Sequence, residues 1–106
     1  MFQASTYSVD ISGLTLENFA IVDSALYDII AVGAQITDDN INLSDNRLDV
    51  DALYEFLNDI IPCTNPCTMS VRRWFDPNDN WFVDGANWTI DQLFVMAASK
   101  NITILI

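Results

Sequence analysis

The residues of this chain best suited to chemistry are carboxylates, and three of them recur at a helical spacing. Asp51, Glu55 and Asp59 lie four residues apart, so they share one face of any helix that contains them. Successive carboxylates would lie about 6 Å apart along the helix axis. Like charges at this spacing destabilise a helix by roughly 0.2–0.5 kcal/mol per pair. Asp45 and Asp49 extend the acidic track upstream, and the whole row predicts a surface that binds positive charge.

Two interpretations of this row remain open. In the structural one, the acids are solvated faces and helix caps, and a halophilic or marine origin accounts for the excess of Asp over Lys. In the functional one, the carboxylates stand in for a phosphate backbone, which in duplex DNA carries one charge every 3.4 Å along each strand. A nucleic-acid-binding protein would then meet the row with its own Arg and Lys. By analogy of composition, small acidic phage inhibitors of restriction, CRISPR or DNA-repair enzymes share this character.

A second group of oxygen ligands lies in residues 76–87, DPNDNWFVDGAN. In its ligand positions this stretch resembles an EF-hand or dockerin-type calcium loop, which implies a Ca²⁺ site. The implied ligands are Asp76, Asn78, Asn80, Asp84 and Asn87. Trp81 stands where such a loop needs glycine, and Asn87 replaces the usual bidentate Glu. We favour the interpretation of this stretch as a turn built from turn-forming residues, with the calcium loop as the alternative.

The composition excludes several classes of function. Fifteen acidic residues face four basic ones, giving a net charge of −11, which repels nucleic acid and anionic membranes and attracts basic protein surfaces. The chain contains no His, so Ser-His-Asp and Cys-His nucleophile systems cannot form. Cys63 and Cys67 cannot complete a zinc tetrahedron by themselves; they form either a local disulfide or buried thiols. We therefore expect no enzyme, no cofactor and no resident metal, with Ca²⁺ as the alternative.

The helices expected to position these groups follow from apolar periodicity and capping residues. A helix over about 15–33 has Thr15 as its cap and apolar positions 19, 22, 26, 29, 30 and 33 on one face. A second helix, over about 50–61, starts after Asp49 or Asp51 and ends at Pro62. A third, over about 89–100, opens with a capping box formed by Thr89 and Gln92.

Strands are expected at both ends of the chain, at 6–11 and at 102–106, because apolar and β-branched residues dominate there. Residues 68–75 and 80–83 read as a hairpin, although the first segment could equally form a short helix. The predicted fold is α+β, a single domain over 1–106, with three helices packed on a small sheet that includes the N- and C-terminal strands. Asp23 and Asp28 interrupt the hydrophobic run over 19–36, so no membrane span is expected.

The function predicted from the sequence is a non-enzymatic interaction protein, and the most specific version is a phage or viral inhibitor. Its partner would be the basic surface of a nucleic-acid-binding protein in the cytoplasm of the cell, the host cell if the protein is viral; direct nucleic-acid and membrane binding are not expected. The partner-binding residues are predicted to be Asp45, Asp49, Asp51, Glu55 and Asp59. Trp74, Trp81 and Trp88 either anchor the contact or belong to the core, and we expect core for at least two of them.

Overall fold

The computed structural model describes residues 8–37, 39–74 and 81–106, which form an α+β fold with two helices and several small parallel sheets. Its elements follow the chain in this order: β1 (Ser8–Asp10), β2 (Thr15–Leu16), β3 (Asp28–Ile30), β4 (Gln35–Ile36), β5 (Asn40–Asn42), α1 (Val50–Asp59), β6 (Cys67–Ser70), α2 (Ile90–Ser99) and β7 (Ile102–Leu105). The N- and C-terminal strands are present, as predicted.

The strands pair in parallel because the chain winds in successive coils. Ser8 pairs with Asp28 and Thr15 with Gln35, 20 residues on in both cases. A parallel bridge between Ala20 and Asn42 continues the pattern, and β5, β6 and β7 then pair side by side in that order. Each coil therefore stacks on its neighbour in the sequence, which is the organisation of a solenoid.

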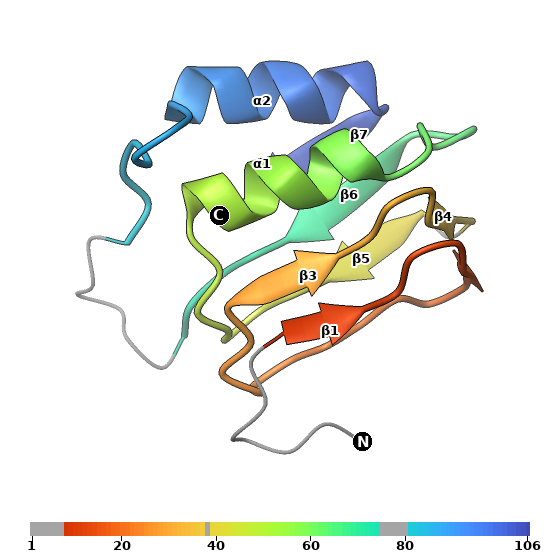
Figure 1. The fold of residues 1–106 in the computed structure, drawn as a ribbon, viewed down its shortest axis with the longest axis horizontal. Coiled ribbons are helices and arrows are strands. Elements are labelled where there is room, and N and C mark those ends of the chain that lie inside the picture. The colour runs from red at the N-terminus through yellow and green to blue at the C-terminus, as the bar shows by residue number, and fades with distance from the viewer. Residues whose placement is uncertain (1–7, 38, 75–80) are drawn as a thin grey trace.

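The coils form two layers (Figure 1). The β5–β6–β7 sheet is one layer; α2, α1, β3 and β1 lie side by side in the other, so helices in the later coils occupy the place that short strands hold in the earlier ones. Apolar side chains fill the space between the layers. The largest that are fully buried include Phe56, Ile41, Leu43, Leu53 and Met69.

A buried asparagine fixes the turn that follows β5. Asn46 is 2% exposed, and its Nδ2 donates to the carbonyl oxygens of Ile21 at 2.6 Å and Leu43 at 3.1 Å. Its Oδ1 accepts from the backbone N–H groups of Ser24 and Leu26, both at 3.2 Å. One side chain thus satisfies buried backbone groups of two neighbouring coils.

The sequence around this asparagine carries a periodic signal. Ile41, Leu43 and Leu48 are buried beside Asn46, giving the spacing I-x-L-x-x-N-x-L. Leucine-rich solenoid repeats use this spacing for a strand followed by a turn. Over these eight residues, β5 and the turn that follows it show the corresponding structure.

The predicted first helix, over about 15–33, is wrong. This segment contains β2 and β3 instead, and φ is positive at Asn18, Asp23 and Ala25 between the two strands and at Gly33 after β3. A right-handed helix cannot contain these backbone angles. Phe19, Ile21, Ile29 and Ala31 are buried at alternate positions. Ile29 lies in β3, and Phe19 and Ile21 flank the parallel bridge at Ala20, so the apolar pattern that fits a helix serves parallel pairing instead. Pairing with a neighbouring coil, 20 residues away in the sequence, selects strands over a helix. That pairing cannot be inferred from the residues of the segment alone.

The other two helices are confirmed, with ends that differ slightly from prediction. Helix α1 starts at Val50 after the Asp49 cap and ends at Asp59, with Ile60 already extended at ψ 156°. Helix α2 covers Ile90–Ser99, and the predicted capping box of Thr89 and Gln92 is present. No helix in the described residues is long and apolar enough to cross a membrane.

The hairpin interpretation of 68–75 and 80–83 does not hold where the chain is described. β6 is a strand, but it pairs in parallel with β5 and β7, and residues 81–83 form no strand. Residue 80 and most of the connecting turn lie outside the described residues. At the N-terminus, residues 6 and 7 of the predicted strand are also outside them, and the remainder contains β1.

Candidate functional site

Two of the five predicted partner-binding acids accept hydrogen bonds from backbone N–H groups of the chain itself. Asp49 is the N-cap of α1, and its Oδ1 accepts from the backbone N–H of Ala52 at 2.8 Å. Asp45 lies in the turn after β5 with φ 60°, and its Oδ1 accepts from the backbone N–H of Trp74. Asp49 thus caps its own helix, whereas Asp45 connects the turn after β5 to the segment that follows β6.

Asp51 has a longer-range structural task. Its carboxylate accepts from the backbone N–H of Trp88 at 3.0 Å and from both the backbone N–H and the side-chain amide of Asn87, at 3.2 and 3.3 Å. The segment leading to α2 is thereby held against the first turn of α1. A Cβ added to Gly85 would lie 1.9 Å from Asp51 Oδ1, so the chain passes the carboxylate at a distance that only glycine allows.

Glu55 and Asp59 form, with Asp28 of β3, the acidic part of a groove of about 280 Å³. The aromatic residues Tyr54 and Trp88 also line this groove. Within the described residues, no side chain or backbone group hydrogen-bonds or pairs with these three carboxylates. They are therefore distinct from the three acids that act as caps or as a tether. We call the groove lined by Asp28, Tyr54, Glu55, Asp59 and Trp88 the acidic groove.

Three of the four basic side chains contact backbone carbonyls or rings of the chain. Lys100 Nζ donates to the carbonyl oxygens of Asn58 and Ile60 at the end of α1. Arg73 donates to the carbonyl oxygen of Leu48 at 2.7 Å and lies 4.2 Å from the Trp81 ring. Arg72 lies 5.7 Å from the ring centroid of Trp74. Arg72 and Arg73 contact residues that do not line the acidic groove, whereas Lys100 binds the end of α1, where Asn58 lines the groove beside Asp59.

The three tryptophans differ in environment. Trp88 is half-buried and stacks on Tyr54 at 4.3 Å with an interplanar angle of 11°, which makes one wall of the acidic groove. Trp81 is half-buried against the core, whereas Trp74 is 67% exposed. Trp74 is thus the free aromatic surface, while Trp88 contributes a ring to the groove.

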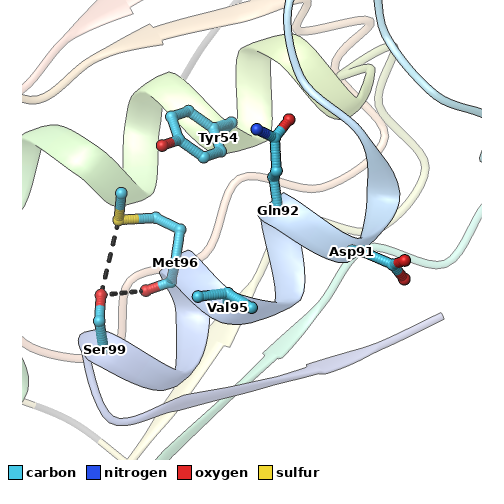
Figure 2. A pocket seen from close by; sticks show the side chains of 6 residues that line it. All are labelled: Tyr54, Asp91, Gln92, Val95, Met96 and Ser99. Atoms are coloured by element: carbon cyan, nitrogen blue, oxygen red, sulfur yellow. Dashed lines mark hydrogen bonds between the residues drawn. The ribbon is translucent and has the colours of Figure 1, made fainter.

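A second depression lies between α1 and α2 (Figure 2). It has a volume of about 420 Å³ and is lined by Tyr54, Asp91, Gln92, Val95, Met96 and Ser99. In Figure 2 the side chains of Tyr54, Gln92 and Met96 lie in the space between the two helices. Tyr54 lines this depression as well as the acidic groove. We call it the interhelical groove.

The residues of the calcium alternative are only partly described. Asp76, Asn78 and Asn80 lie outside the described residues. Asp84 Oδ1 accepts from the backbone N–H of Ile90 at 2.8 Å, and Asn87 donates to Asp51. Strand β6 comes before this stretch, where a helix precedes the loop of an EF-hand. Among the described residues, no three His, Cys, Asp or Glu side chains gather as a metal site would require.

The sequence left the two cysteines open between disulfide and thiols; in the structure both are buried thiols that form no disulfide. Burial raises the pKa of the Cys63 thiol above its ordinary value, since the charged thiolate is poorly solvated there. A thiol in this state is a weak nucleophile at neutral pH. Both sulfurs belong to the core beside β6, and neither lines the two grooves described above.

Comparison with known proteins gives no relative: no family model matches the chain, and neither a curated protein nor a solved structure is significantly similar to it. The site therefore rests on its geometry. Sequence reasoning placed Glu55 and Asp59 in it but missed Asp28 and Tyr54. Asp28 was assigned to a helix that does not exist, and it lies beside α1 because β3 packs against that helix.

Proposed function

We propose that this protein is a non-enzymatic interaction module that binds a basic surface of another protein through the acidic groove. The observation that supports the proposal is a difference among the acids themselves. Asp45, Asp49 and Asp51 accept hydrogen bonds that hold the fold. Asp28, Glu55 and Asp59 line one groove and receive none within the described part of the chain.

The groove has the chemistry to receive an Arg or Lys side chain. Each exposed ion pair contributes roughly 0.2–1 kcal/mol, and a cation against an aromatic face adds about 0.5–1 kcal/mol. The Tyr54 and Trp88 rings lie beside the carboxylates for this second contribution. The net charge of −11 would accelerate the encounter with a positive partner at low salt.

The more specific proposal is that the partner is a nucleic-acid-binding protein, which a phage-type inhibitor would block by presenting negative charge in place of phosphate. Of the five acids in the predicted row, only Glu55 and Asp59 line the acidic groove, and Asp28 of β3 supplies its third negative charge. The direct assay is DNA cleavage by purified restriction and CRISPR nucleases with increasing amounts of this protein. Inhibition that disappears in Glu55→Gln/Asp59→Asn supports the proposal; inhibition that the variant retains contradicts it.

The site of binding can be mapped independently of the partner. A synthetic Lys/Ser peptide is titrated into isotope-labelled protein at low salt, and backbone amide shifts are followed by NMR. We expect the largest shifts in residues 28–30, 54–59 and 88. Equal shifts at acids that line neither groove, such as Glu17 and Asp23, would show that the peptide senses only net charge, and the acidic groove would lose its role.

A further inference from the structure

The interhelical groove exposes apolar surface next to the acidic groove. Val95 is 71% exposed in the middle of α2, and Met96 lies half-buried beside it. Together with Tyr54 they line the same depression of about 420 Å³. A contiguous apolar patch on a small protein marks a place where another molecule binds more often than scattered exposed residues do.

The two grooves are continuous through one side chain. Tyr54 lines both of them, and its ring is held in place by stacking on Trp88. Asp91 lines the interhelical groove as well. The apolar surface therefore has carboxylates on two sides: Asp91 from α2, and Glu55 and Asp59 from α1.

We infer that the interhelical groove receives an apolar side chain from a basic amphipathic segment of the partner, whose Lys or Arg residues occupy the acidic groove. This inference rests on the proposed function and defines the partner's chemistry: a large aliphatic or aromatic anchor flanked by positive charges. An amphipathic helix provides such an arrangement, because residues three or four apart lie on one face, about 5–6 Å from each other.

Charge complementarity decides against two other occupants. A second copy of this chain would bring its own net charge of −11 against Glu55, Asp59 and Asp91, and like charges at an interface are unfavourable. Nucleic acid would meet the same repulsion. A cationic segment is the occupant whose charge is opposite to that of the rim.

The test uses two fluorescent peptides of about 18 residues, long enough to form a helix on binding. One has Leu at every third or fourth position and Lys elsewhere on its surface; the other carries Ser in place of each Leu, so that both have the same charge. Fluorescence anisotropy gives their affinities for the wild type, for Val95→Ser and for Val32→Ser. Val32 is the matched control, because it is also an exposed valine, at 61%, and lines neither groove.

We expect the Leu/Lys peptide to bind the wild type about tenfold more tightly than the Lys/Ser peptide, as burial of one large aliphatic side chain implies. Val95→Ser should weaken the Leu/Lys peptide about fivefold and leave the Lys/Ser peptide within about twofold. Val32→Ser should change neither. Thermal unfolding of both variants checks that the fold is intact. Because both valines are exposed, we expect little change in stability.

The contrary outcomes separate the two proposals. If Val95→Ser and Val32→Ser behave alike, the interhelical groove is not the anchor site, while salt-sensitive binding of the Lys/Ser peptide keeps the proposed function. If Glu55→Gln/Asp59→Asn binds both peptides as the wild type does, the proposed function fails and the inference fails with it. A wild-type dimer in solution that Val95→Ser dissociates would assign the groove to self-association and overturn the inference.

Discussion

Asp51 is the acidic residue whose structural role can be tested most sharply. Asp51→Ala removes the acceptor for the backbone N–H groups of Asn87 and Trp88 and for the Asn87 amide. The segment that leads into α2 would lose its tether to α1. We therefore expect a loss of stability that is much larger than a surface substitution normally causes.

The magnitude follows from the exposure of the donors. A hydrogen bond to a charged group contributes about 1.5–3 kcal/mol. Asn87 is exposed, so water replaces most of what its two bonds provide, whereas the half-buried Trp88 N–H, at 3.0 Å from Oδ1, has less access to water. Together the bonds account for about 2 kcal/mol, and an acid in the first turn of a helix adds about 0.3–1 kcal/mol through the helix dipole. We expect Asp51→Ala to lower the free energy of unfolding by about 2–3 kcal/mol.

Asp91 provides the matched control. It is the second residue of α2, as Asp51 is the second residue of α1, so both acids interact with a helix dipole in the same position. No hydrogen bond to the Asp91 side chain is formed by the described residues. Urea unfolding followed by tryptophan fluorescence should give a loss of about 0.3–1 kcal/mol for Asp91→Ala. Equal losses for the two variants would refute the tether.

A double-mutant cycle with Gly85 gives a second measurement of the same contact. Gly85→Ala would place its Cβ 1.9 Å from Asp51 Oδ1 and so displace the carboxylate. When Asp51 is already alanine, this clash is absent. The combined loss should be smaller than the sum of the single losses, with a coupling of about 1 kcal/mol or more. Strict additivity would show that the two residues do not interact.

Three further predictions concern the core and the backbone. Asn46→Ala should lower the free energy of unfolding by about 3–4 kcal/mol, because its buried partners are left unsatisfied; Asn42→Ala, which removes one acceptor for the Ser44 N–H, should cost about 1 kcal/mol. Ala25→Gly should stabilise by about 0.5–1 kcal/mol, because φ is 53° at Ala25, a region that glycine enters without strain; Ala20→Gly, in the bridge to Asn42, should destabilise instead. Because the pKa of Cys63 is raised by burial, a thiol reagent near pH 8 should react more slowly with folded than with unfolded protein. For the same reason the free energy of unfolding should fall as pH rises above the ordinary thiol pKa, since the thiol of the unfolded chain ionises first. Equal effects within either variant pair, or equal thiol reactivity in both states, would contradict the corresponding prediction.

The parts of the fold that the sequence predicts correctly are those with local signals. Helix α2 begins at a capping box whose two residues are three positions apart in the sequence, and α1 has an uninterrupted apolar face ending near Pro62. The segment over 15–33 has no such local signal to decide its secondary structure. Its apolar residues fit both a helix and two strands, and backbone pairing 20 residues away selects the strands.

The candidate site shows the same division. Glu55 and Asp59 follow directly from helical spacing, and the structure brings them to one groove. Spacing could not show that Asp51, in the same row, is engaged by a segment 36 residues further along the chain. Asp28 joins the groove only because β3 lies beside α1 (Figure 1). The spacing of apolar residues around Asn46, in residues 41–48, was the available sign of stacked coils. It would have argued against a helix over 15–33.

The most direct test of the acidic groove is the affinity of the Lys/Ser peptide for two charge-matched variants at about 50 mM and about 500 mM salt. Glu55→Gln/Asp59→Asn removes two groove carboxylates, while Glu17→Gln/Asp23→Asn removes two exposed carboxylates that do not line the groove. We expect the groove variant to bind about five- to tenfold more weakly at low salt, as two ion pairs imply, and the control to bind nearly as the wild type does. Equal weakening of both variants would contradict the account, because binding would then depend on net charge alone.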